Sequence, residues 1–203
     1  MGEIGRQLVH LFGLVFILMS LLVDKLLISV YFFMIASFFL VYSYYVRREK
    51  TLLARLAERV ENGFRDFANS FERETTRIPY SGAFWFYFSC GLTLLLFPVQ
   101  TAVVACSILA VSDSLSTIMG SRFGTQRIVG NKTLEGSTFF FISAFIVAFL
   151  FINFWAALLA ALTSTIAELL PEMRMFGVLR NRELINDNLT VPLITALLLS
   201  FIL

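Results

Sequence analysis

A polar stretch between two long apolar segments holds most of the residues that could do chemistry. It runs from Ser112 to Ser137 and reads SDSLSTIMGSRFGTQRIVGNKTLEGS. Its aspartate, Asp113, falls within an apolar segment of membrane-spanning length. A carboxylate at that depth is costly, so an intramembrane aspartate predicts a functional site. A divalent cation such as Mg²⁺, which bridges carboxylate and phosphate oxygens, would stabilise it there.

Four small residues share the predicted helix face of Asp113, namely Ser116, Thr117, Gly120 and Gly124. Small residues along a transmembrane face also let helices pack closely, and this explanation stays open for the two glycines. It does not account for Asp113, which needs a cation or hydrogen-bond donors nearby.

The loop that follows, residues 120–136, carries groups that bind phosphate. Lys132 can act as a point charge on a phosphate, Thr133 and Ser137 supply hydroxyls, and Gly136 allows a close approach of the backbone. The N–H groups that open the next helix also favour an anion. The loop shares residue types with a P-loop but not its spacing, and no strand is predicted before it. We predict a nucleotide-binding loop, although topology and lipid headgroups also explain its basic residues, Arg122 among them.

Further polar residues lie near the same end of other predicted helices. Glu168 lies late in the sixth apolar segment, and Asp187 and Asn188 open the seventh. Carboxylates beside a basic loop fit metal-assisted phosphoryl transfer, and helix capping is the alternative for Asp187. Arg6 and His10, four residues apart on the first helix, reach the same boundary. A purely structural role is the alternative for His10.

The elements that must position these residues are predicted to be membrane helices. The 203-residue chain is 58% hydrophobic and 15% charged, and its mean hydropathy is +0.82. A soluble domain of this length carries more charge. Apolar segments of near-spanning length occur at residues 8–23, 26–46, 80–97, 99–119, 137–152, 154–170 and 189–203. We therefore predict an all-α, polytopic transmembrane helical bundle of about seven spans, forming a single integral membrane domain over residues 1–203.

The distribution of charge predicts the orientation of this bundle. Of the 16 lysines and arginines, 15 fall in the N-terminal tail and in segments 47–77, 120–136 and 171–187. The positive-inside rule places these segments, the N-terminus and the active site on the cytoplasmic side of a multi-pass cell-membrane protein. Residues 47–77 repeat apolar positions every three or four residues, which predicts an amphipathic helix. We expect it to lie on the headgroups, and a lid over the nucleotide site is the alternative.

Six motifs occur along the chain in a fixed order. They are E-x-x-R-x-x-x-H from Glu3 to His10, SGAFWF at Ser81–Phe86, D-x-x-S-x-x-x-G-x-x-x-G from Asp113 to Gly124, KTLEGS at Lys132–Ser137, AELLPE at Ala167–Glu172 and DNLTVP at Asp187–Pro192. In this order they resemble the motifs of the CTP-dependent lipid-alcohol kinases, a family that includes dolichol kinase, phytol kinase and yeast-type diacylglycerol kinase. The chain departs from the family pattern at Gln7, where Lys is common, and at Ser112, where Gly is common.

The resemblance implies an integral membrane kinase that takes the γ-phosphate of CTP, uses Mg²⁺ or another divalent cation, and phosphorylates a lipid alcohol in the bilayer. Dolichol or another polyprenol is the first choice of acceptor, in a small prokaryotic or archaeal form of the enzyme. Phytol or geranylgeraniol comes second and diacylglycerol third. Membrane lipids surround the protein, no nucleic-acid partner is expected, and the oligomeric state is left open.

The resemblance also assigns roles to residues. The predicted metal ligands are Asp113, Glu135 and Glu168. The predicted catalytic group consists of Asp113, Lys132, Glu135 and Asp187. The predicted nucleotide contacts are Ser116, Gly120, Arg122, Gly124, Lys132, Thr133, Gly136, Ser137 and Asn188. Arg6 and His10 are further candidates for the site.

Two other classes of protein stay open. A CDP-lipid-forming cytidylyltransferase also uses CTP at the membrane boundary, but it releases pyrophosphate where a kinase releases CDP. A transporter or a structural bundle has no turnover at all. A transporter is expected to have broken spans near the midplane, whereas the polar residues of this chain gather at one boundary.

Overall fold

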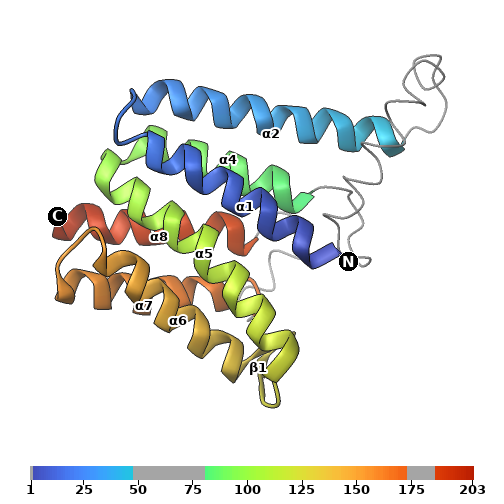
Figure 1. The fold of residues 1–203 in the computed structure, drawn as a ribbon, viewed down its shortest axis with the longest axis vertical. Helices are drawn as coiled ribbons and strands as arrows, with labels where there is room; N and C mark the ends of the chain where they lie inside the picture. Colours follow the sequence, from blue (N-terminus) through green and yellow to red (C-terminus); the bar gives the residue numbers. More distant parts are fainter. Residues whose placement is uncertain (1, 48–80, 173–185) are drawn as a thin grey trace.

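The computed structural model describes residues 2–47, 81–172 and 186–203 (Figure 1). Within them the chain forms seven α-helices and one small β-hairpin. The elements are, in chain order, α1 (Gly2–Met19), α2 (Lys25–Arg47), α4 (Ser81–Leu96), α5 (Val99–Phe123), β1 (Arg127–Val129), β2 (Lys132–Thr133), α6 (Leu134–Phe149), α7 (Phe154–Leu169) and α8 (Asp187–Ile202). Beyond Arg47, the amphipathic helix predicted over 47–77 lies outside the described residues.

Each predicted apolar segment coincides with one of these helices, so the helical bundle is confirmed. The ends differ by a few residues, since α5 continues to Phe123 rather than ending at 119, and α6 begins at Leu134 rather than at 137. The hairpin between them was not predicted. Its strands have 3 and 2 residues, too few to show an alternating pattern in the sequence.

Two described helices are long and apolar enough to cross a membrane, over Lys25–Ser43 and Val99–Phe123. The other described helices have shorter apolar stretches. The 16 residues of α7, for example, extend about 24 Å, less than the hydrocarbon thickness of about 30 Å.

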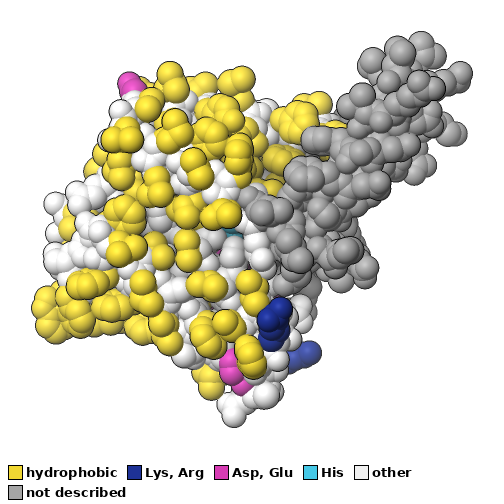
Figure 2. Space-filling model, viewed as in Figure 1, with side chains coloured by type: hydrophobic (Ala, Val, Ile, Leu, Met, Phe, Trp, Pro, Cys, Tyr) yellow, Lys and Arg dark blue, Asp and Glu magenta, His cyan; other side chains and the backbone are white. Residues whose placement is uncertain are grey.

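Large apolar side chains cover the outside of the bundle. Leu22 is 89% exposed, Trp155 72% and Phe201 83%. Among the described residues, the face in Figure 2 is largely hydrophobic, and most of their charged side chains on this face lie near its lower end. Soluble monomers rarely expose so much contiguous apolar surface. Together with the two long apolar helices, this surface indicates a membrane protein.

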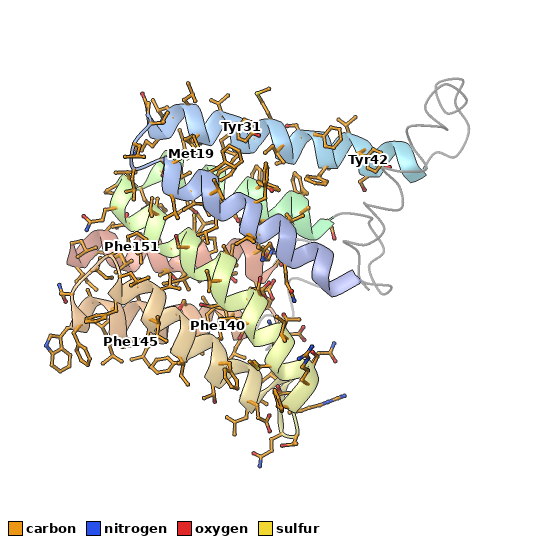
Figure 3. The ribbon with its side chains drawn as sticks, viewed as in Figure 1. Met19, Tyr31, Tyr42, Phe140, Phe145 and Phe151 are labelled. Carbon is orange, nitrogen blue, oxygen red and sulfur yellow. The ribbon has the colours of Figure 1, made fainter. Side chains whose placement is uncertain are left out.

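Helix α5 lies at the centre of the bundle, with α1, α6 and α8 packed along it and α4 and α7 in smaller contact (Figure 1). Every residue from Thr101 to Ala110 is buried. A helix that is apolar on all sides is stable only when neighbours cover all of them, and α5 meets this condition. Helix α2 lies at the edge, where it packs mainly on α4. Aromatic contacts join it to α1, including Tyr31 on Phe16 with ring centroids 4.6 Å apart (Figure 3).

Short turns close the end of the bundle that lies away from the hairpin (Figure 1). Asp24 Oδ1 accepts a hydrogen bond from the Leu26 N–H at 2.8 Å, and Lys25 Nζ donates to the Phe97 carbonyl at 2.7 Å. Asn153 caps α7 by accepting from the Ala156 N–H at 3.0 Å. Because these turns are so short, the polar segments between the helices emerge at the opposite end.

Two glycines bring α5 and α6 together beside the hairpin. A Cβ on Gly136 would lie 3.1 Å from the Ser116 carbonyl oxygen and 3.3 Å from the Gly120 Cα. These distances are tighter than most Cβ contacts, so a side chain at position 136 would have to push the backbone of α5 away by a few tenths of an ångström. The first turn of α6 therefore lies directly against the polar face of α5.

An alanine at Gly136 is expected to destabilise the bundle, because its Cβ would lie too close to backbone atoms of α5, which shift less easily than the end of a side chain. We expect a loss of about 1–3 kcal/mol in the free energy of unfolding, measured as a lower unfolding midpoint in detergent. Gly82→Ala in α4 is the matched control, since no described atom lies within 4 Å of a Cβ there. Equal midpoints for the two variants would contradict the close-packing role of Gly136.

Candidate active site

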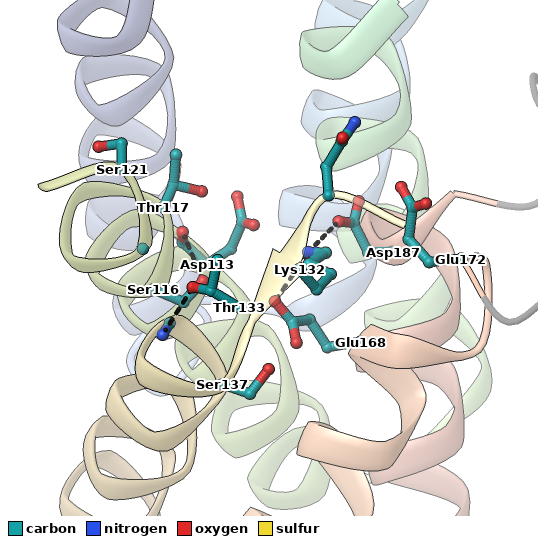
Figure 4. Close-up of a pocket in the computed structure, with 13 residues that line it drawn as sticks. Asp113, Ser116, Thr117, Ser121, Lys132, Thr133, Ser137, Glu168, Glu172 and Asp187 are labelled. Carbon is teal, nitrogen blue, oxygen red and sulfur yellow. Dashed lines mark hydrogen bonds and ion pairs between the residues drawn. The ribbon is translucent and has the colours of Figure 1, made fainter. Parts of the chain in front are cut away.

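A polar cavity of about 190 Å³ opens where the hairpin meets the ends of four helices (Figure 4). Every residue that lines it is polar or glycine, in a bundle that is otherwise apolar. Those residues are Asp113, Ser116, Thr117, Gly120 and Ser121 from α5, Asn131, Lys132 and Thr133 from the hairpin, Gly136 and Ser137 from α6, Glu168 and Glu172 from α7 and its end, and Asp187 from α8.

Lys132 lies at the centre of this cavity. Its ammonium donates to Glu168 Oε1 at 2.7 Å and to Asp187 Oδ2 at 3.0 Å, as the dashed lines in Figure 4 show. The side chain of Glu168 is 1% exposed and that of Lys132 21%. Burial alone would lower the pKa of Lys132, but the carboxylates of Asp187, Glu168 and Asp113 outweigh it and hold that pKa well above its usual value. Lys132 therefore carries a positive charge at every physiological pH.

The hairpin sets the position of Lys132. Strands β1 and β2 pair antiparallel, with Val129 opposite Lys132, and Gly130 turns the chain with a φ of 54°. This left-handed conformation favours glycine. A Cβ at Gly130 would also overlap the Glu172 carboxylate, so the turn lies against the end of α7.

Asp113 lies on the α5 wall of the cavity and also contacts α1. The residue is 3% exposed, and its Oδ2 lies 3.7 Å from Nδ1 of the fully buried His10. The His10 ring stacks on Phe86 of α4 with centroids 4.3 Å apart. Gly13 makes room for this arrangement, because a Cβ there would overlap the Phe86 ring. The predicted approach of His10 to the site is therefore observed, whereas the side chain of Arg6 lies outside the described residues.

Two buried oxygens in the cavity wall have no hydrogen-bond partner among the described residues. They are Glu168 Oε2 and Ser137 Oγ. Buried polar atoms are normally paired, so a water molecule, a metal ion or another ligand in the cavity would complete the bonding of these two. No three His, Cys, Asp or Glu side chains of the described residues lie close enough to hold a metal ion by themselves. The donors fit Mg²⁺ that takes one or two carboxylates and completes its coordination with phosphate and water.

Glu135, one of the three predicted metal ligands with Asp113 and Glu168, does not line this cavity. Its Oε1 accepts hydrogen bonds from the Thr125 hydroxyl and from the Thr125 N–H, the latter at 3.0 Å. These bonds, and that of its own backbone N–H, lower the pKa of Glu135 to about 2. Glu135 thus holds the loop between α5 and the hairpin in place through its hydrogen bonds to Thr125.

Three of the predicted nucleotide contacts do not line the cavity. Arg122 is exposed near the end of α5, Gly124 packs against Thr133, and Asn188 is buried between α8 and α4. Thr133 lines the cavity but also caps α6, since its Oγ1 accepts from the Gly136 N–H at 3.2 Å.

The N–H groups that open α6 are largely used within the protein, contrary to the predicted anion site there. The Leu134 N–H donates to the Gln126 carbonyl at 2.8 Å, and Thr133 takes the Gly136 N–H. Asn131 and Glu172 line the cavity but were not predicted as site residues from the sequence. Glu172 ends the AELLPE motif, so that motif was the signal that could have found it. Asn131 stands beside Lys132 and carried no separate signal.

Three known proteins are similar in sequence to this chain. Over 85 residues, 41% of this chain, the sequence is 36% identical to dolichol kinase of Saccharomyces cerevisiae. That match spans only 16% of the yeast enzyme. An uncharacterized protein of Methanocaldococcus jannaschii is 28% identical over 98% of this chain and 94% of its own length. An uncharacterized protein of Rickettsia prowazekii is 27% identical over 94% of this chain and 90% of its own. No protein-family model and no solved structure matches.

Removing the ammonium of Lys132 is expected to destabilise the fold, because Glu168 would stay buried without its cation. We expect Lys132→Met to lose about 3–5 kcal/mol in the free energy of unfolding. Adding Glu168→Gln should restore part of that loss, since the amide is neutral. Lys25→Met, which removes a single ammonium–carbonyl bond at the other end, should lose only about 1 kcal/mol. Equal losses for the two lysine variants would rule out a buried ionic cluster.

The low pKa of Glu135 predicts a pH-dependent contribution to stability. Its folded pKa of about 2 lies below the usual 4.5, so the ionised carboxylate stabilises the fold above about pH 4.5 and loses this effect as the pH falls toward 2. Unfolding midpoints of wild type and Glu135→Gln should therefore converge between about pH 5 and about pH 2. A gap that stays constant over this range would mean that the Thr125 contacts do not depend on charge.

Proposed function

We propose that this protein is a membrane kinase that transfers the terminal phosphate of a nucleoside triphosphate to the hydroxyl of a lipid alcohol. The observation that carries the proposal is the all-polar cavity at one end of an apolar bundle, with Lys132 held between Glu168 and Asp187 and with Asp113 in its wall. A phosphate-binding cation and carboxylates at the edge of an apolar surface suit a charged donor and a lipid acceptor. The partial similarity to yeast dolichol kinase supports the same function.

The finer form of the proposal rests on the resemblance of the motifs. The donor is CTP, and the acceptor is dolichol or another polyprenol, with phytol, geranylgeraniol and diacylglycerol as further members of the same class. The described helices cross the membrane as seven spans, and the cavity opens to the cytoplasm, where the nucleotide is found.

Lys132 has the central role in binding the donor. Its ammonium is a point charge that a phosphate oxygen can approach from the cavity. Glu168 and Asp187 hold the ammonium in one position before the nucleotide arrives, so little reorganisation is needed on binding. Ser116, Thr117 and Ser137 add hydroxyls along the same wall, and the free Ser137 Oγ can donate to a phosphate oxygen.

Asp113 and the second oxygen of Glu168 are the groups that would hold Mg²⁺. Such an ion would neutralise the negative charge that develops on the phosphates during phosphoryl transfer. His10 lies behind Asp113 and, packed on Phe86, limits the directions in which the carboxylate can turn. The side chains of this protein would therefore contribute to catalysis by positioning the reactants and by supplying fixed charges.

The test is incubation of the purified protein with γ-labelled CTP and a panel of lipid alcohols. We expect label in a polyprenyl phosphate and CDP as the second product. Pyrophosphate release from CTP and a lipid phosphate would instead identify a cytidylyltransferase, and no turnover with any acceptor would contradict the proposal.

Asp113→Asn is expected to lower the rate of label transfer by about 10²–10³-fold, because a neutral amide cannot balance a cation or fix charge in the cavity. The matched control is Asp24→Asn, the same chemical change at the opposite end of the bundle. Undiminished transfer by Asp113→Asn, or an equal loss in both variants, would show that Asp113 has no special role.

A further inference from the structure

The residues that line the cavity differ in how far they lie from solvent. Asp113 and Glu168 are 3% and 1% exposed, and Ser137 is also buried, so these three form the floor. Asn131 and Ser121 are exposed, and they mark the mouth on the hairpin side and on the α5 side. The groups proposed to hold Mg²⁺ and phosphate therefore lie at the floor, and a nucleoside triphosphate would enter with its terminal phosphate first.

Glu172 lies at the mouth, against the turn of the hairpin. A Cβ on the exposed Gly130 would overlap Oε2 of Glu172, so the carboxylate is next to that turn. Figure 4 shows Asp113 and Glu172 on opposite sides of Lys132. Among the described residues, the Glu172 carboxylate has no hydrogen-bond or ion-pair partner, and it lines the cavity. It is therefore available to a ligand at the mouth.

A carboxylate at this place limits which part of a nucleotide can lie beside it. It repels phosphate oxygens, and it accepts hydrogen bonds but donates none. Its neighbour in the ligand is therefore an uncharged group that carries donors. In a nucleoside triphosphate the ribose follows the phosphates, and its two adjacent hydroxyls suit the two oxygens of one carboxylate. An acidic side chain binds a ribose hydroxyl in the same way in dinucleotide-binding folds.

The size of the cavity separates the ribose from the base. Sites for small molecules typically enclose about 300–1,000 Å³, whereas this cavity has a volume of about 190 Å³. It can enclose only part of a nucleotide. With the phosphates at the floor, the ribose would reach the mouth and the base would extend beyond it.

We propose that Glu172 accepts hydrogen bonds from the ribose hydroxyls of the donor nucleotide at the mouth of the cavity. This inference rests on the proposed kinase function and assigns the part of the site that holds the sugar. Glu172 is a binding residue in this arrangement, because it lies away from the floor where the terminal phosphate reacts. It selects nucleotides that carry ribose hydroxyls over those that lack them.

The experiment measures equilibrium binding of CTP and of its dideoxy form, which lacks both ribose hydroxyls, each with Mg²⁺ and without a lipid alcohol. Wild type should bind CTP about tenfold more tightly, because the dideoxy form leaves the carboxylate without its donors. Glu172→Met removes the acceptor but keeps an unbranched side chain, so it should bind the two nucleotides about equally. Glu172→Gln keeps one acceptor oxygen and should restore part of the preference.

The ratio of the two affinities separates ribose recognition from damage to the fold, because a distorted cavity weakens binding of both nucleotides. Glu135→Met is the matched control, since it removes a carboxylate that does not line the cavity, and it should keep the wild-type ratio. Equal affinities in wild type, or an unchanged ratio in Glu172→Met, would overturn the assignment. Ribose-dependent binding without turnover of any acceptor would refute the kinase but support the role of Glu172. Turnover with no preference between the two nucleotides would refute that role alone.

Discussion

A lysine ammonium held between two carboxylates at the end of an apolar bundle governs the arrangement around it. Charges taken out of water are tolerated only when each has its partner in place. Lys132, Glu168 and Asp187 come from the hairpin, α7 and α8, so their pairing ties together three segments that are distant in the sequence. The cluster sets one ammonium against two carboxylates, so its formal charge is negative and an anionic ligand would enter the cavity together with a cation.

The hairpin can reach this cluster only because α5 and α6 approach so closely. Gly136 lies against the backbone of Ser116 and Gly120, and Thr133 fills the space next to Gly124. Glu135 then closes the loop by accepting bonds from Thr125. Not every residue that the sequence suggested as a ligand contact lines the cavity. Asp113, Lys132 and Ser137 line it, whereas Gly124 and Glu135 stabilise the loop beside it.

Much of the fold could be predicted from the sequence because a long apolar segment leaves the chain few alternatives to a helix. The gathering of Asp113, Lys132, Glu168 and Asp187 was also predictable, since topology brings all of them to one end. Their pairing was not, because the position of Lys132 depends on a hairpin too short to leave a periodic pattern in the sequence. The contact of His10 with Asp113 likewise depends on Gly13 and Phe86 fitting together across two helices. Small residues looked alike in the sequence whether they make room for a ligand or for another helix.

The direct succession of Asp187 and Asn188 has a consequence for how the protein can diversify. One rigid turn of α8 holds a side chain of the ionic cluster and a side chain that faces α4. Any rotation of that turn shifts both together, so changes in α8 cannot adjust one without disturbing the other. Helix α4 is free of this coupling, because it contributes no residue to the cavity lining. Substitutions in the first turn of α4 should therefore leave the ionic cluster unchanged, whereas substitutions in the first turn of α8 should disturb the cluster and the contact with α4 together.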